Sequence, residues 1–125
     1  MGQYCLIADK TGHANTYFEY KRHLKDFHKD VISCQAQAST EDEALEVLRK
    51  ALVHTMRLGD TLVIYVDQTR PDFKTQFTSE ETFPTEQIFE YDHWREQANY
   101  MKLVREDENR DFEGNKNCFQ MQDTF

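Results

Sequence analysis

Short apolar runs alternate with helical stripes along the first half of the chain. The apolar run at residues 4–8 is closed by a turn at 9–12, which predicts a buried strand. From Asn15 to near Lys29 the pattern predicts a helix, because large apolar side chains recur at spacings of three and four: Tyr17, Tyr20, Leu24, Phe27 and Val31.

Residues 40–66 carry the clearest local signals. Thr40 and Glu43 have the spacing of a capping box, and Gly59 suits the left-handed residue that ends a helix. The apolar side of the helix between them is made up of Ala44, Leu45, Leu48, Ala51, Leu52, Thr55 and Met56. The apolar run at 61–66 then predicts a strand that is covered on both faces and lies in the middle of a sheet.

The order of these elements predicts the fold class. A short β-branched stretch at 31–34 supplies a strand between the two helices, so the chain is expected to form a βαβαβ unit. Right-handed crossovers would set it as a small, mostly parallel sheet with helices on both faces. We therefore expect an α/β fold of the P-loop or Rossmann-like kind, a three-layer sandwich.

The second half is more polar and more aromatic. The Pro-punctuated connection at 67–86 is too aromatic to be free in solvent, so we expect it to pack on the domain. Asp92 is expected to cap a third helix with an apolar stripe of Trp94, Ala98, Met101 and Val104. Residues 1–104 are thus predicted to form one domain, and 105–125 an extended, polar C-terminal tail that is mobile in the free domain, although 118–121 could be a last strand.

Composition narrows the range of functions. With 125 residues the chain is long enough for one core, and its formal net charge of -8 repels nucleic acids and anionic lipid surfaces. It has no apolar run of roughly 18 residues, the length that crosses a membrane. The three cysteines, Cys5, Cys34 and Cys118, are odd in number and far apart, which favours free thiols and a cytoplasmic location.

The turn after the first predicted strand is unsuited to phosphate. Residues 8–15 contain a single glycine, an acidic Asp9 and no Gly-Lys pair, whereas phosphate-binding loops need several glycines and a lysine. Asp67 ends the strongest strand as the Mg²⁺-binding aspartate ends a Walker B strand, but an ordinary turn capped by Asp67 has the same pattern. We therefore predict no catalytic residue, cofactor or metal ligand.

A family resemblance appears in the same stretch. The segment Ile7-Ala8-Asp9-Lys10-Thr11-Gly12-His13-Ala14-Asn15, followed by Tyr17-Phe18, resembles the strand, turn and helix of the degenerate modules in the dynein heavy chain motor ring. Residues 51–64, with a helix, a glycine and an apolar strand, are similar to the next part of those modules. The resemblance covers residues 5–66 and implies a P-loop-type scaffold that has lost nucleotide hydrolysis. It departs from the family in having no adjoining ring modules, no arginine finger that we can place and an unrelated second half.

Aromatic residues set among charges predict a partner surface in the second half. Exposed aromatics next to charge are the usual composition of binding hot spots, and the expected set is Phe73, Phe77, Phe83, Tyr91, Phe112, Phe119 and Phe125. For the first three, the alternative is that the connection simply wraps the sheet edge.

The sequence favours a non-catalytic adaptor or structural subunit that binds other proteins, in a cytoskeletal or ciliary assembly if the resemblance holds. The alternative is a small nucleotide- or phosphate-handling enzyme that uses Asp67 and Mg²⁺. The turn at residues 9–14 discriminates between them.

Overall fold

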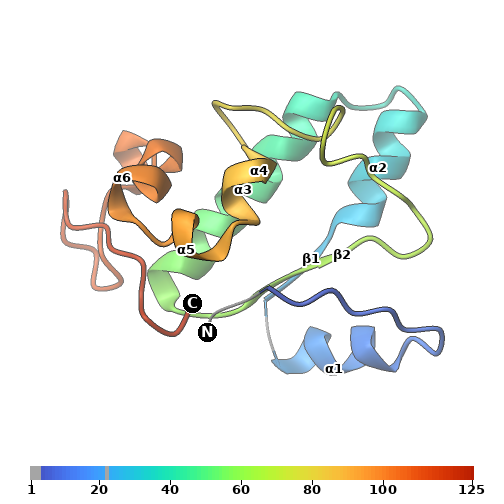
Figure 1. The fold of residues 1–125 in the computed structure, drawn as a ribbon, viewed down its shortest axis with the longest axis horizontal. Coiled ribbons are helices and arrows are strands. Elements are labelled where there is room, and N and C mark those ends of the chain that lie inside the picture. The colour runs from blue at the N-terminus through green and yellow to red at the C-terminus, as the bar shows by residue number, and fades with distance from the viewer. Residues whose placement is uncertain (1–3, 22) are drawn as a thin grey trace.

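Helices surround a small parallel sheet in the computed structural model, which describes residues 4–21 and 23–125 (Figure 1). In chain order the elements are α1 (His13–Lys21), β1 (His23–Asp26), α2 (Phe27–Gln35), α3 (Glu41–Leu58), β2 (Leu62–Tyr65), α4 (Thr85–Ile88), α5 (Tyr91–Trp94), α6 (Gln97–Tyr100) and the 3-10 helices η1 (Met101–Leu103) and η2 (Glu106–Glu108). The chain therefore has a mixed α/β fold. No helix of the described residues has the length and apolar character needed to cross a membrane.

The sheet has two strands within the described residues. β1 and β2 are parallel, with Leu24 opposite Val63, and α2 and α3 form the crossover between them. The strand predicted at 61–66 is confirmed, but all four residues of β2 are half-buried rather than covered on both faces. Its expected place in the middle of a larger sheet is not found.

Three predictions for the first 35 residues are wrong. Residues 4–8 are extended but exposed, and they form no strand. The single helix expected from Asn15 to Lys29 is two helices with β1 between them, and residues 31–34 are part of α2. The apolar spacing in the sequence continues across the start of β1 and therefore predicted a single helix. In the structure Leu24 pairs with Val63 in the sheet, and such long-range pairing overrides local helical spacing.

Helix α3 begins and ends as its sequence predicts. The Thr40 hydroxyl accepts from the Glu43 amide (3.2 Å), and the Glu43 carboxylate accepts from the Thr40 amide (3.1 Å), which completes the capping box. Gly59 ends the helix with φ 73°. A Cβ at this position would lie 2.8 Å from Gln122 Cβ and would also clash with Thr124, so both the turn and the close approach of the C-terminal segment require glycine.

The core surrounds α3. Buried α3 residues occupy more than the predicted stripe, because the aromatic connection and the last third of the chain pack on it as well as α2. Arg49 is buried on this additional side, where it donates to the Leu103 carbonyl (2.8 Å) and pairs with Glu46 and Glu108. These carboxylates outweigh the effect of burial and raise the pKa of Arg49.

The aromatic connection packs as predicted, whereas the third helix does not form as one unit. Phe77 and Phe83 are buried in the core. The region expected to be one helix is divided into α5, α6 and η1, with Glu90 rather than Asp92 at the N-cap of α5, and Ala98 is exposed. Trp94 is buried as expected.

Residues 105–125 are not a detached tail. Phe119 and Met121 belong to the same core as α3. The Gln122 amide donates to the Met56 carbonyl (3.0 Å), and the Thr124 hydroxyl donates to the Gly59 carbonyl (2.7 Å). The prediction of a mobile strip is therefore wrong. These hydrogen bonds and the Arg49–Glu108 ion pair tie residues 105–125 to α3, and the sequence alone does not reveal these distant partners.

Phe119→Ala is expected to lower the free energy of unfolding by about 3–5 kcal/mol, the usual cost of emptying a buried phenylalanine site. Phe112→Ala is the matched control, because this side chain is 61% exposed; its effect should stay within about 0.5 kcal/mol. Urea denaturation followed by Trp94 fluorescence measures both. Equal midpoints for the two variants would show that the C-terminal segment contributes nothing to the core.

Candidate functional site

The turn before α1 is closed by a carboxylate. Asp9 Oδ1 accepts from the Thr11 amide (2.9 Å) and hydroxyl (2.7 Å), and Asp9 Oδ2 accepts from the Ala14 amide (2.7 Å) in the first turn of α1. These bonds form because an aspartate can bend back onto amides that have no partner at a helix start. The side chain of Asp9 thus lies where a phosphate-binding loop would hold an anion.

The electrostatics of this turn oppose phosphate binding. The hydrogen bonds from Thr11 and Ala14 lower the pKa of Asp9 to about 2, so its carboxylate is ionised at neutral pH. A phosphate would have to displace this carboxylate and would meet its negative charge. The predicted unsuitability of the turn for phosphate thus has a structural basis.

The phenol of Tyr65, at the end of β2, has a raised pKa. Desolvation of the phenol raises the pKa of Tyr65, and Asp67, Asp26 and Asp9 raise it further. Asp67 has a left-handed backbone (φ 51°), which aspartate tolerates. Thr69 closes the turn after β2, because its amide donates to the Val66 carbonyl (3.0 Å); the capping role predicted for Asp67 therefore falls to Thr69.

A depression of about 510 Å³ lies beside this turn, and its lining is His28, Ile32, Gln35, Asp67, Gln68, Thr69 and Arg70. His28 is paired with Asp26 through Nδ1, so that nitrogen is not available to a substrate. Among the residues that the structure describes, no three His, Cys, Asp or Glu side chains gather as metal ligands would. Among the described residues the depression therefore holds one His–Asp pair and no cluster of metal ligands.

Three of the seven predicted partner residues lie in the core. Phe77, Phe83 and Phe119 are buried, so they are not available to a partner in this conformation, and their inclusion in the surface is corrected. Phe73 is partly buried and stacks on the Phe27 ring with 5.9 Å between the ring centroids. The connection thus packs inward on Phe27 of α2, and the alternative course along the sheet edge stays a prediction. The sequence could not reveal this because burial here depends on the distant helix α3.

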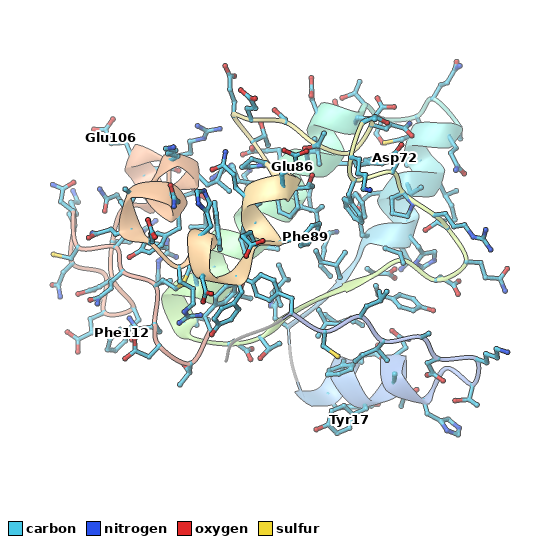
Figure 2. All side chains as sticks on the ribbon, in the orientation of Figure 1. Tyr17, Asp72, Glu86, Phe89, Glu106 and Phe112 are labelled. Carbon is cyan, nitrogen blue, oxygen red and sulfur yellow. The ribbon has the colours of Figure 1, made fainter. Side chains whose placement is uncertain are left out.

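The other predicted partner residues are spread over the surface. Tyr91 is half-buried under the Arg95 guanidinium (5.2 Å), and Phe125 is partly buried, with its carbonyl accepting from Arg95. Phe112 is exposed and lies on the opposite side of the chain from α1 (Figure 2). The structure does not bring Phe112 together with the rest, and its role in binding stays a prediction.

The largest concentration of exposed apolar side chains lies elsewhere, in residues 4–20. Ten large apolar side chains are exposed in the described part of the chain, and half of them belong to this segment: Tyr4, Leu6, Ile7, Tyr17 and Tyr20. Figure 2 shows Tyr17 pointing away from the rest of the chain. The sequence placed Tyr17 and Tyr20 on the same apolar helix face as Leu24 and Phe27, but β1 separates the two pairs in the structure.

No family model, no curated protein and no solved structure matches this chain. The resemblance of residues 5–66 to the ring modules of dynein stays a prediction.

The Ala14 amide proton is expected to follow the ionisation of Asp9 with a midpoint near pH 2. Because the folded pKa of Asp9, about 2, lies below its ordinary value of 3.8, the cap contributes fully above pH 3.8 and is lost as the pH falls through about 2. An NMR pH titration measures this, and Asp9→Asn, which cannot ionise, should show no such step. A wild-type midpoint near 3.8 would contradict the cap.

Proposed function

We propose that this chain is a non-catalytic protein-binding module, an adaptor or structural subunit of a larger assembly. The observation that carries the proposal is the concentration of exposed apolar side chains on residues 4–20. Apolar side chains exposed to solvent cost free energy that contact with another protein recovers.

The chemistry of α1 suits protein recognition. Tyr17 and Tyr20 are exposed, Tyr20 by 82%, and tyrosine is enriched in binding hot spots because it combines a large apolar ring with a hydroxyl. Residues 4–21 carry two acidic and two basic side chains, so the segment does not share the net charge of -8 of the whole chain. An acidic partner is therefore not repelled at this surface.

The proposal also includes the three-layer arrangement of the fold and the cellular location of the protein. A three-layer arrangement is supported by α1 lying on one side of the sheet and α2 and α3 on the other (Figure 1). A cytoplasmic, cytoskeletal or ciliary setting is supported only by the resemblance of residues 5–66 to dynein ring modules. The competing function is an Mg²⁺-dependent nucleotide enzyme that uses Asp67, which follows the end of β2.

The test compares two variants in quantitative pull-downs from native extract. A double variant, Tyr17→Ser with Tyr20→Ser, should reduce recovery of the proteins captured by the wild type about tenfold or more, since two hot-spot side chains are removed. Ile32→Ser is the matched control, because Ile32 is also exposed but lies on α2, and it should capture the same proteins as the wild type. Equal capture by all three would contradict the proposed surface.

The enzyme alternative has its own readout. Mg²⁺ with ATP or GTP should leave the melting temperature unchanged, whereas a ligand at 100 times its dissociation constant would stabilise the fold by about 2.7 kcal/mol. A clear upward shift that Asp67→Asn abolishes would favour the enzyme over the adaptor.

A further inference from the structure

Two parts of this molecule have backbone groups without a strand partner, and their apolar compositions match. The first is the arm, residues 4–8, which is extended, uncharged and outside the sheet, with Leu6 96% exposed. The second is the outer edge of β2, which has β1 as its only ladder partner within the described residues. An unpaired edge presents a row of backbone donors and acceptors to which another strand can add.

The edge strand β2 carries no charged side chain. Exposed edge strands are commonly guarded by charged side chains, and β1 carries Lys25 and Asp26. β2 contains only Leu62, Val63, Ile64 and Tyr65, with no charge at all. An apolar, uncharged strand is therefore the occupant that fits β2, and the sequence Tyr-Cys-Leu-Ile-Ala of the arm has this composition.

The arm also runs in the direction that a parallel strand requires. The N-terminal end of the arm lies near the start of β2. Tyr4 packs on Tyr91, with 5.2 Å between the ring centroids. The neighbouring Arg95 binds the C-terminal residues, which in turn contact Gly59 just before β2. Asp9, just beyond the other end of the arm, is close enough to Tyr65 to raise the pKa of that phenol. The arm therefore points the same way as β2, without forming a ladder with it.

We propose that two copies of this chain exchange their arms, so that residues 4–8 of each copy add as a third, parallel strand to the outer edge of β2 in the other. Within one chain the arm stays outside the sheet although it runs beside β2, held by Tyr4 on Tyr91 and by the Asp9 cap. A molecule that carries both an unpaired strand and an unpaired edge is self-complementary, and two copies close as a symmetric pair.

This self-association goes beyond the proposed function, because it needs no foreign partner and uses residues 4–8 rather than Tyr17 and Tyr20. It converts the arm of each copy from exposed apolar coil to strand and removes both open β2 edges. The exchange is the general route by which an element with intramolecular affinity makes a dimer at low cost.

Disulfide trapping between separately tagged copies tests the pairing. Both copies carry Cys34→Ser and Cys118→Ser, and the donor copy keeps Cys5 as its only cysteine. The acceptor copy carries Cys5→Ser and one new cysteine on β2, either Val63→Cys or Ile64→Cys. These two positions face opposite sides of the sheet. One of the two acceptors should couple to the donor about tenfold faster than its control on β1, because pairing raises the local concentration of the thiols. The controls are Leu24→Cys and Lys25→Cys, the register partners of Val63 and Ile64. Equal rates on β1 and β2 would overturn the proposal.

The oligomeric state gives a second, independent readout. Sedimentation should show a dimer for the wild type and a monomer for Ile7→Asp, whereas Ile32→Asp should remain a dimer. The two isoleucines are matched, since they are 51% and 50% exposed, and Trp94 fluorescence confirms that each variant folds. The Tyr17→Ser, Tyr20→Ser variant should also remain a dimer, which separates this proposal from the proposed function.

Other occupants of the β2 edge give distinct results. If the arm pairs with its own sheet, a chain with both Cys5 and the reactive β2 cysteine gives mainly a disulfide of monomer mass, and the wild type sediments as a monomer. Either result overturns arm exchange. A monomeric wild type in which neither β2 cysteine reacts shows an edge without any partner strand, and overturns it as well.

Discussion

The burial of α3 on more than one side is the constraint on which the rest of the structure depends. A helix with a single apolar stripe needs one covering layer, but α3 also buries Arg49 and Val53 away from that stripe. A buried guanidinium must have partners, and Arg49 finds them in Glu46, Glu108 and the Leu103 carbonyl. The last quarter of the chain is therefore tied to α3 by chemistry as well as by apolar packing.

The two ends of the chain are attached to the rest of the fold by different numbers and kinds of contact. The C-terminal segment is fixed to the end of α3 through Met56 and Gly59, whereas residues 4–21 reach the body through β1 and the contact of Tyr4 with Tyr91. The energy that holds the fold is thus concentrated around α3, and the exposed apolar surface is concentrated at the N-terminal segment. A module that binds through a weakly held segment can adapt it to a partner without loss of its core.

Local signals predicted the elements whose causes are local. The capping box of Thr40 and Glu43, the left-handed Gly59 and the β2 strand depend on near neighbours, and all three are confirmed. Adjacent residues also predicted that the Asp9 turn is unsuited to phosphate; that stays a prediction, to which the structure adds that Asp9 caps α1.

Long-range contacts decided what the sequence could not predict. The break of the first helix at β1 depends on Val63, which is far along the chain from Leu24, and the burial of Phe119 depends on α3. The charges at 105–113 suggested a solvated tail, because nothing nearby shows that Glu108 pairs with Arg49. For the same reason the sequence included Phe77 and Phe83 in a surface, whereas the structure buries them and exposes Tyr17 and Tyr20.

Native-state hydrogen exchange, at a concentration low enough to keep the chain monomeric, tests this account most directly. The slowest amides should lie in α3 from Leu45 to Met56, the Gln122 amide should exchange in the same cooperative unit because it donates to Met56, and residues 5–8 should exchange fastest. If the Gln122 amide instead exchanges as fast as the amides of residues 5–8, the C-terminal segment is detached from α3, and the central claim is contradicted.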